Sequence, residues 1–587
     1  MSKPILIVAD AANTAGIEAV RRGFSKKLGR DFDFELVEDP KITGGFIAIV
    51  DGKVYDASFS TKLHDLSDAL GEDDAESSDP AASSFQTVGS ILRKRAATAA
   101  AGARVYDYGE VTSFSDGIAK IRGLTGAKYG ELLDFDGGAV GITLDLDETG
   151  VGAAVIDGAV STSSVVHPTG RVAEVPVGTE LIGRVVDPLG RALDGAELKV
   201  RKTRPVEAKA PNIMQRAPVD TPLETGVLAI DSMIPIGRGQ RELIIGDRQT
   251  GKTALAVSAI LSQKDTGVLC VYCAIGQKQS TVAALARKLS DSGAMKYTVI
   301  VSASASTSAA MQYIAPYAAC AIAEEFMYAG RDALIVYDDL SKHAQAYRTL
   351  SLLLRRPSGR EAYPGDVFYL HSRLLERAAR LAPELGGGSL TAIPIVETMA
   401  ADVSAYIPTN VISITDGQIY LESELFSAGQ RPAVNVGLSV SRVGRAAQSK
   451  AMKAVSGSLR LEVARYRDMA VFAQFGADID SATAEMLRVG EALMELLKQS
   501  EQRMYSLSEQ ICLLLASSEG VFAKYPKREI REAVVRLLLF VRTNAPIVMR
   551  SIDGAGKLED FDREDLVRCF SAFHAEEAKT ADSRGGA

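Results

Sequence analysis

Within Glu242-Leu-Ile-Ile-Gly-Asp-Arg-Gln-Thr-Gly-Lys-Thr-Ala-Leu-Ala256, residues 246–253 spell G-x-x-x-x-G-K-T, the pattern most informative about the architecture of this chain. The apolar run 243–245 predicts a buried strand, and the apolar positions between residues 254 and 261 predict a helix. Strand, glycine-rich loop and helix in this order are the setting in which the motif binds phosphate. The sequence therefore predicts a phosphate-binding loop.

The residue types of this loop fit the chemistry of an anion site. Gly246 and Gly251 let the backbone approach an anion without a clashing Cβ. Backbone N–H groups at the start of the helix then point toward the phosphates. Lys252 can reach the terminal phosphates, and the Thr253 hydroxyl can ligate Mg²⁺.

Composition limits the other possibilities. The chain has 587 residues and a formal charge of −8, which predicts several domains and argues against nucleic acid as the main partner. No apolar run reaches the length of a membrane span, and the first ten residues fit neither a secretory signal nor a transit peptide. Cys270 and Cys273 lie in an apolar run, so we expect buried cysteines in a strand rather than a redox or zinc pair.

The patterns along the chain predict a multidomain α/β protein. Residues 1–70 predict a small α/β docking module, with a helix over 11–28, a strand over 32–37, a hairpin over 45–55 and a helix over 61–70. Residues 71–104 predict an acidic linker over 71–84 followed by a helix over 85–101. Short strands broken by glycine, including 105–108, 117–121, 139–144 and 152–156, predict a small β-barrel domain over 105–202.

The rest of the chain predicts a nucleotide-binding domain and a helical domain. Strands alternate with helices over 203–449, which indicates a mainly parallel sheet. The buried strand 333–337 ends in Asp338, whose carboxylate could hold Mg²⁺ through water about 80 residues after the loop. Residues 450–587 predict a helical bundle, with helical periodicity over 461–475, 482–497, 507–515 and 530–541.

Six further stretches carry a resemblance to a known family. The loop Gly246–Thr253 is similar to that of the alpha subunit of F-type ATP synthases. The similarity covers roughly residues 105–550 and includes the stretches Gly183-Arg-Val-Val-Asp-Pro-Leu-Gly190, Ala274-Ile-Gly-Gln-Lys278, Tyr337-Asp-Asp-Leu-Ser-Lys342, Tyr406-Ile-Pro-Thr-Asn-Val-Ile-Ser413, Val440-Ser-Arg-Val-Gly444 and Phe472-Ala-Gln-Phe-Gly476.

The N-terminal module resembles a different chain of the same enzyme. Glu38-Asp-Pro-Lys-Ile-Thr-Gly-Gly-Phe46 and Gly52-Lys-Val-Tyr-Asp-Ala-Ser58 are similar to the C-terminal part of the delta subunit. In that family, delta lies on top of the ring and contacts alpha N-termini. A fusion of the two would raise the effective concentration of one for the other.

The resemblance implies an assembly and a place in the cell. It implies a regulatory, mainly non-catalytic subunit of a rotary ATP synthase that makes ATP from ADP and phosphate with a transmembrane proton gradient. The implied partners are catalytic beta subunits in an alternating hexameric ring with three copies of each, the central-stalk gamma subunit, and peripheral-stalk b and delta-type subunits. The implied location is the cytoplasmic face of the bacterial cell membrane.

The resemblance also separates binding from catalysis. Catalytic beta subunits have a glutamate where Gly276 is followed here by Gln277, and a neutral amide cannot act as a general base. Glu242 is the alternative carboxylate. Alpha subunits lend an arginine to the neighbouring catalytic site, and Arg442 matches it, with Ser439 in the same interface segment. Arginine suits a phosphoryl transition state because its charge is permanent and planar.

The nucleotide ligands follow by position. The resemblance implies ATP or ADP binding by Gly246, Asp247, Arg248, Gln249, Thr250, Gly251, Lys252, Thr253, Gln277, Arg431 and Gln499, and Mg²⁺ binding by Thr253 and Asp338. Two residues depart from the family pattern. Glu501 stands where a second glutamine is frequent, and Arg445 stands where a small residue is usual.

Two other functions remain open at this point. One is a catalytic ring ATPase of the same superfamily, beta-type or secretion-type, which needs a carboxylate at position 277. The other is a ring ATPase that translocates nucleic acid, which the charge of −8 disfavours.

Overall fold

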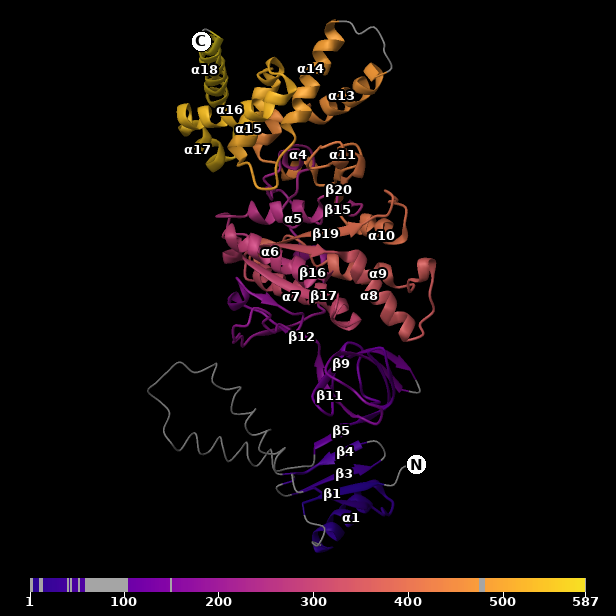
Figure 1. Cartoon of the computed structure of the whole chain (residues 1–587). Coiled ribbons are helices and arrows are strands. Elements are labelled where there is room, and N and C mark those ends of the chain that lie inside the picture. Colours follow the sequence, from indigo (N-terminus) through magenta and orange to yellow (C-terminus); the bar gives the residue numbers. More distant parts are fainter. Residues whose placement is uncertain are drawn as a thin grey trace, which may run out of the picture. The chain divides into compact units, whose positions relative to one another are not determined.

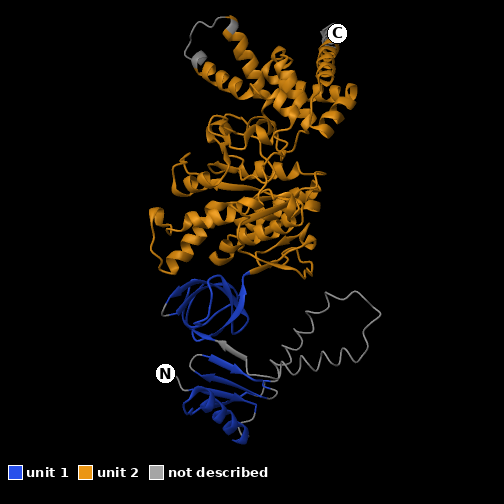
Figure 2. Ribbon diagram, turned by 180° about the vertical axis from the view of Figure 1, so that it is seen from behind, with its two compact units in different colours: residues 1–173 blue, residues 174–587 orange. Residues whose placement is uncertain are grey.

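A computed structural model of the chain describes residues 4–9, 14–39, 42, 45–50, 53–58, 104–147, 150–474 and 481–585. It forms two compact units, residues 1–173 and residues 174–587 (Figure 2). The expected helix 61–70, acidic linker 71–84 and helix 85–101 lie outside the described residues.

The first unit begins with a five-stranded sheet and one helix. Its strand order is β2-β1-β3-β4-β5, with β1 parallel to β2 and the other pairs antiparallel. Phe24 of the helix packs against Leu6, Ala48 and Val50 of the sheet. The elements are β1 (Ile5–Val8), α1 (Thr14–Leu28), β2 (Glu35–Glu38), β3 (Phe46–Val50), β4 (Lys53–Asp56) and β5 (Arg104–Asp107).

One strand was assigned to the wrong domain by the sequence. The run 105–108 was expected in the barrel, but β5 pairs with β4 and closes the edge of the N-terminal sheet. Alternation of apolar residues predicts a strand but does not show which strand it pairs with. Here β5 pairs with the edge of β4 that β3 leaves free. Only Tyr108 separates β5 from the first barrel strand.

The expected barrel follows. Six antiparallel strands close in the order β10-β7-β6-β11-β8-β9 around an aliphatic core that includes Val111, Ile121 and Val166. The strands are β6 (Gly109–Ser115), β7 (Ile118–Gly123), β8 (Glu131–Phe135), β9 (Ala139–Asp147), β10 (Gly150–Asp157) and β11 (Val165–Val172). Residues 174–202 lie in the second unit, where β12 (Glu174–Pro176) pairs with β14 (Thr203–Pro205).

The second unit is organised by an eight-stranded sheet (Figure 1). The order is β13-β17-β16-β18-β19-β15-β20-β21, and all neighbours are parallel except β20 and β21. The strands are β13 (Val185–Val186), β15 (Leu243–Gly246), β16 (Leu269–Gln277), β17 (Thr298–Ser304), β18 (Asp332–Asp338), β19 (Ser389–Glu397), β20 (Gly417–Leu421) and β21 (Val440–Ser441).

Helices cover this sheet, as expected for strands that are buried on both faces. Cys270 and Cys273 are buried free cysteines of β16, as the sequence predicted. The helices are α4 (Leu228–Met233), α5 (Lys252–Leu261), α6 (Gln279–Asp291), α7 (Ala309–Tyr328), α8 (Leu340–Leu353), α9 (Val367–Leu375), α10 (Tyr406–Ile414) and α11 (Ser423–Ser427). Short 3-10 helices are η1 (Thr179–Leu181), η2 (Ile213–Gln215), η3 (Ala294–Tyr297), η4 (Arg360–Ala362), η5 (Pro383–Leu385) and η6 (Gly444–Ala447).

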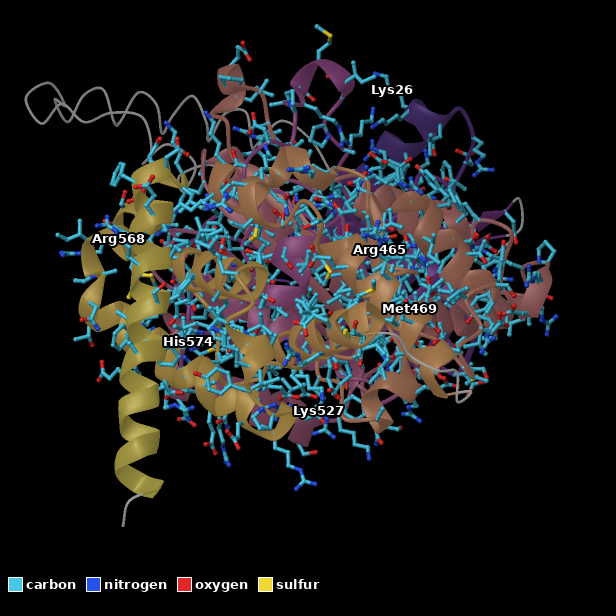
Figure 3. The ribbon with its side chains drawn as sticks, turned by 90° about the horizontal axis from the view of Figure 1, so that it is seen from above. Lys26, Arg465, Met469, Lys527, Arg568 and His574 are labelled. Carbon is cyan, nitrogen blue, oxygen red and sulfur yellow. The ribbon has the colours of Figure 1, made fainter. Side chains whose placement is uncertain are left out.

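The chain ends in a helical region that shares one hydrophobic core with the sheet. Ile244 of β15 and Leu513 of α15 belong to this core. Ser506 and Glu509 form a capping box that starts α15. The elements are α12 (Lys450–Val455), α13 (Leu459–Gln474), α14 (Ser481–Leu496), α15 (Leu507–Ser518), η7 (Phe522–Lys524), η8 (Lys527–Glu529), α16 (Ile530–Asn544), α17 (Pro546–Ala555) and α18 (Asp560–Gly585). Figure 3 labels Arg465 and Met469 of α13, Lys527 of η8, and Arg568 and His574 of α18.

The fold class predicted from the sequence is confirmed: an N-terminal α/β module, a β-barrel, a mainly parallel sheet that carries the phosphate-binding loop, and C-terminal helices.

Candidate nucleotide site

The phosphate-binding loop joins β15 to α5, as its motif predicts. Gln249 and Gly251 have positive φ angles of 61° and 94°, so the backbone turns sharply just before the start of α5. Gly246 has no room for a side chain, because a Cβ there would lie 2.3 Å from the carbonyl oxygen of Leu421. Close approach of β20 therefore requires glycine at the first position of the motif, and left-handed backbone favours it at Gly251.

Lys252 lies folded over the loop. Its ammonium donates a hydrogen bond to the backbone carbonyl of Asp247 at 2.5 Å. Burial lowers the pKa of Lys252 below its ordinary value, against the opposing field of Glu397, Asp339 and Asp338. The ammonium therefore lies beside the backbone of the loop, and phosphate oxygens can replace the Asp247 carbonyl as its hydrogen-bond acceptor.

The Asp247 side chain holds the loop rather than facing into it. Its carboxylate accepts hydrogen bonds from the Thr398 hydroxyl at 2.6 Å, the Ala401 backbone N–H at 3.0 Å and the Ser423 hydroxyl at 3.2 Å. Burial raises the pKa of Asp247, but these hydrogen bonds outweigh it and leave the pKa below its ordinary value. Asp247 thus ties the phosphate-binding loop to the segments that follow β19 and β20.

The Asp338 carboxylate collects three donors at the end of β18. Thr253 donates its hydroxyl hydrogen to Oδ2 at 2.8 Å, Tyr272 donates to Oδ2 at 2.5 Å, and Gln277 donates its amide hydrogen to Oδ1 at 3.1 Å. The structure therefore brings Thr253, Gln277 and Asp338 together, three residues that the sequence had placed in one site. A hydroxyl and a carboxylate at this distance form an oxygen set that suits a hard cation.

Asp339, the residue after Asp338, lies at the start of helix α8. Its carboxylate caps α8 by accepting the Lys342 backbone N–H at 2.8 Å, and the Lys342 ammonium lies 3.3 Å away. Burial and the neighbouring Asp338 charge raise the pKa of Asp339 to about 6, although Lys342 opposes them. Of the two consecutive aspartates, Asp338 faces the loop and Asp339 starts the next helix.

A pocket of about 450 Å³ opens beside the loop. Its walls include Thr250 and Gly251 of the loop, Leu255 of α5, Phe426 and Arg431. The Arg431 guanidinium lies 4.6 Å from the centre of the Phe426 ring, a cation–π contact that holds it at the pocket wall. The pocket has the size of a small-molecule site and touches the phosphate-binding loop directly.

Gln499 lines the same pocket, but its amide is already bonded to the backbone. The amide nitrogen donates to the carbonyls of Gly226 and Arg503, both at 2.6 Å. The amide oxygen accepts the Leu228 N–H at 3.1 Å. Gln499 therefore shapes the pocket wall through three hydrogen bonds, and a direct contact of Gln499 with the nucleotide stays a prediction.

Glu397 was missed by the sequence analysis. It ends β19 and pairs in register with Gly246 at the start of the loop. Its carboxylate lies 3.8 Å from the Arg248 guanidinium and raises the pKa of Lys252 electrostatically. The signal was present, because the apolar run 392–396 ends in a carboxylate, the pattern that identified Asp338.

Arg442 lies at the end of the sheet remote from its own loop. β20 runs parallel to β15, with Leu421 beside Gly246, whereas Gly417 at the start of β20 pairs with Ser441. Gly417 and Leu421 are four residue steps apart along the strand, about 13 Å. The Arg442 side chain is exposed, and no hydrogen bond or ion pair of its guanidinium occurs among the residues that the structure describes. It cannot serve the phosphate-binding loop of its own chain.

Ser439 differs from Arg442 in its surroundings. It is fully buried, its hydroxyl donates to the Asn435 carbonyl at 2.7 Å, and it accepts the Tyr420 N–H at 2.9 Å. Ser439 thus anchors the segment that leads to Arg442. Arg445 donates a hydrogen bond to the Lys453 carbonyl at 2.7 Å.

Glu242 cannot replace the carboxylate that Gln277 lacks. It precedes β15 and so lies at the end of this strand opposite the loop. It is fully buried, accepts a hydrogen bond from Gln240 at 2.7 Å, and lies close to Gly417. Burial raises the pKa of Glu242 well above its ordinary value.

Comparison with known proteins then identifies the family. Residues 226–441 match the ATP synthase alpha/beta family, nucleotide-binding domain, and residues 448–573 match the ATP synthase alpha/beta chain, C terminal domain. ATP synthase subunit alpha of Caldanaerobacter subterraneus subsp. tengcongensis is 58% identical over 470 residues, which cover 80% of this chain and 93% of that protein. The chain belongs to the ATP synthase alpha/beta family.

Further comparisons agree with this assignment. ATP synthase subunit alpha of Acetivibrio thermocellus is 54% identical over 499 residues, which cover 84% of this chain and 99% of that protein. Residues 6–70 match the ATP synthase delta (OSCP) subunit. Both resemblances stated from the sequence, to alpha subunits over most of the chain and to delta at its start, are confirmed. As a family member, the chain is a component of an ATP synthase complex.

Among the described residues, no helix combines the length and the apolar character needed to cross a lipid bilayer. These residues also contain no group of three or more His, Cys, Asp or Glu side chains that is arranged to hold a metal ion.

Proposed function

We propose that this chain is the nucleotide-binding, non-catalytic alpha subunit of a rotary ATP synthase, and that it lends Arg442 to the catalytic site of a neighbouring subunit. The observation that supports this most is the position of Arg442. Its guanidinium is exposed and lies on the far end of β20 from the loop of its own chain. A permanently charged planar fork presented in this way suits the transition state of a phosphoryl transfer on another chain.

The site of the chain itself binds Mg-ATP or Mg-ADP. Lys252 and the N–H groups of the loop hold the phosphates, and the pocket beside Arg431 takes the nucleoside. Thr253 and Asp338 supply the oxygens for Mg²⁺, the latter through water, and Mg²⁺ there screens the phosphate charge. Gln277 donates a hydrogen bond to Asp338, so its side chain orients the carboxylate and accepts no proton from water.

The partners that we propose are those of a rotary ATP synthase. The chain alternates with catalytic beta subunits in a ring with three copies of each, encloses the central-stalk gamma subunit, and contacts peripheral-stalk b and delta-type subunits. The complex works at the cytoplasmic face of the bacterial cell membrane and couples ATP synthesis to a proton gradient. Nucleic acid is no part of it.

The N-terminal module docks onto the peripheral stalk. Strand β5 pairs with β4 at the edge of the delta-like sheet, and the first barrel strand begins one residue after β5 ends. The module is therefore held to the start of the barrel by the hydrogen bonds between β4 and β5. Deletion of residues 1–70 should leave ATP binding intact and uncouple the ring from the membrane sector. Unchanged coupling would remove this role.

The decisive experiment compares Arg442→Ala with Arg445→Ala in a ring reconstituted with catalytic subunits. Arg445 is a matched control, because it is three residues away and its guanidinium is engaged by the Lys453 carbonyl. We expect Arg442→Ala to lower ring hydrolysis by about 10³-fold or more, with ATP binding to the isolated chain unchanged. Arg445→Ala should stay within a few-fold of the parent. Normal turnover in the Arg442→Ala ring contradicts the proposal.

Glu397 favours one alternative, a catalytic ATPase. Its carboxylate lies beside Arg248 at the loop, where it could activate water in place of the missing glutamate. That function predicts sustained hydrolysis by the isolated chain that Glu397→Gln abolishes. We expect negligible turnover by the isolated chain.

A further inference from the structure

The pocket beside the loop has apolar lining residues of the kind that a flat ring can contact. Its lining extends along α5 from Gly251 to Ser258, about 10 Å at the rise of an α-helix. Its apolar residues include Val227, Leu255, Leu421 and Phe426. This inference rests on the proposed function, which places the phosphates of a nucleotide at Gly251 and the base farther along α5.

The base needs polar partners, and Gln499 has no free donor to offer it. Its amide nitrogen donates to the Gly226 and Arg503 carbonyls, and its oxygen accepts one hydrogen bond, from the Leu228 N–H. Opening the bond to Leu228 would take the partner from the N–H of a fully buried residue. A donor for the base edge must therefore come from another side chain of the same pocket.

Glu501 and Lys288 are the charged pair that lines this pocket. The Lys288 ammonium lies 3.4 Å from the Glu501 carboxylate, and the two side chains are 39% and 62% exposed. A carboxylate only accepts hydrogen bonds and an ammonium only donates them. Because the pair is exposed, it costs little to open when a ligand offers better partners.

These two groups match the hydrogen-bonding edges of purines. Guanine presents N1–H and N2–H as adjacent donors and O6 as an acceptor, so a carboxylate can accept two hydrogen bonds while an ammonium donates to O6. Adenine presents one donor, N6–H, beside the acceptor N1, so it offers the carboxylate a single bond. We propose that Glu501 and Lys288 read the base edge, and that this site binds guanine nucleotides as well as adenine nucleotides.

The test measures binding of nucleotides to the full-length chain with Mg²⁺. Fluorescent mant-ATP and mant-GTP are titrated into the parent and into Glu501→Gln. The parent should bind mant-GTP within tenfold of mant-ATP. Glu501→Gln should weaken mant-GTP by at least tenfold and change mant-ATP by less than threefold, because a bidentate contact to a base is worth about this much discrimination.

Glu110→Gln is the matched control. Glu110 is an exposed carboxylate of the barrel, paired with Arg122 at 3.3 Å, so the variant removes the same charge far from the pocket in sequence and in the other unit. It should change neither affinity. An equal effect of Glu110→Gln and Glu501→Gln would assign the change to net charge and overturn the proposal.

A second measurement needs no variant. Inosine triphosphate keeps O6 and N1–H but lacks the amino group of guanine, so it offers the carboxylate one bond fewer. In competition with mant-ATP on the parent chain, we expect GTP to bind several-fold more tightly than ITP. Equal affinities would contradict the two-bond contact.

The outcomes separate this inference from the function beneath it. Binding of mant-ATP with mant-GTP weaker by more than tenfold overturns the guanine inference alone. A guanine-to-adenine ratio that Glu501→Gln leaves unchanged does the same. Failure of both nucleotides to bind overturns the proposed nucleotide site itself.

Discussion

The hydroxyl of Thr253 donates a hydrogen bond to the Asp338 carboxylate over 2.8 Å, although 85 residues separate them. The first residue belongs to the start of α5 and the second ends β18. Parallel strands end at the same edge of a sheet, so a loop after one strand and a carboxylate after another meet there. The two oxygens that we propose for Mg²⁺ therefore lie within hydrogen-bond distance of each other in one chain.

Asp338→Asn should weaken Mg-ATP binding by at least about tenfold and leave metal-free ATP binding unchanged. The asparagine oxygen can still accept from Thr253 and Tyr272, and the Gln277 amide can turn to accept from the new NH₂ group, so the fold should persist. Isothermal titration with and without Mg²⁺ measures the difference.

Asp339→Asn is the control for that experiment. Asparagine caps helices as well as aspartate does, so α8 should stay intact and Mg²⁺ dependence should match the parent. Equal Mg²⁺ dependence in parent and Asp338→Asn would remove Asp338 from the metal site.

Glu242→Leu should lower the turnover of a reconstituted ring by about tenfold or more while the isolated chain still binds ATP. The Gln240 amide bridges the Glu242 carboxyl at 2.7 Å and the Ser441 hydroxyl at 3.1 Å, and Ser441 accepts the Gly444 N–H at 3.2 Å. Loss of the Glu242 acceptor therefore loosens the backbone on both sides of Arg442.

Glu242→Gln separates shape from charge at this position. Burial raises the pKa of Glu242 well above its ordinary value and so favours the neutral carboxyl, which an amide resembles. Ring turnover of Glu242→Gln should match the parent. Full activity of Glu242→Leu would show that the bridge does not position Arg442.

Much of the fold and part of the site could be predicted from the sequence. The motif at Gly246–Thr253 and the apolar strand before Asp338 identified the two halves of the site, because backbone geometry demands those residue types at those spacings. The partner of β5 could not be predicted, since hydrogen bonding at a sheet edge leaves no mark on alternation.

Side-chain direction was also beyond the sequence. The resemblance places Asp247 and Gln499 at the nucleotide. In the structure, the polar side-chain atoms of both residues form hydrogen bonds within the chain. Glu397 was passed over although it follows the same kind of strand as Asp338. Whether a carboxylate lies beside the phosphate-binding loop depends on the place of its strand in the sheet and on the register between the strands. Register can be worked out only once the order of the strands in the sheet is known.

Arg377→Met should destabilise the chain by about 3–5 kcal/mol. Arg377 and Glu324 are both fully buried and meet in two hydrogen bonds of 2.7 Å, while Arg377 also donates to the Val206 carbonyl. Removal of the arginine leaves the Glu324 charge buried, and among the described residues only Arg204 then remains paired with it, at 3.5 Å. Urea denaturation followed by circular dichroism measures the loss.

The double variant Arg377→Met, Glu324→Leu should recover much of that loss, because no buried charge then lacks its partner. Arg122→Met, which breaks the exposed pair with Glu110, should cost at most about 1 kcal/mol. If the double variant is less stable than Arg377→Met, the Glu324 side chain stabilises the fold in some way other than by neutralising the Arg377 charge.

Acid should destabilise the chain through His371. Burial lowers its pKa to about 4, and both ring nitrogens lack hydrogen bonds in the described structure. Its neighbour His343, 5.4 Å away between ring centres, also has a pKa held well below its ordinary value by burial, and Arg373 adds to that effect. The unfolded chain takes up a proton near pH 6.5 that the folded His371 refuses until about pH 4, so stability is complete above pH 6.5 and falls as the pH drops.

His371→Phe should abolish this part of the acid sensitivity. From the two pKa values, His371 should cost the parent about 2 kcal/mol between pH 7.5 and pH 5, and a phenyl ring cannot take up that proton. The difference between parent and variant cancels groups that titrate in both, such as Glu224, whose pKa burial raises to about 7. Urea denaturation at the two pH values gives the comparison. An identical loss of stability in parent and His371→Phe would mean that the buried imidazole accepts a proton without cost to the fold.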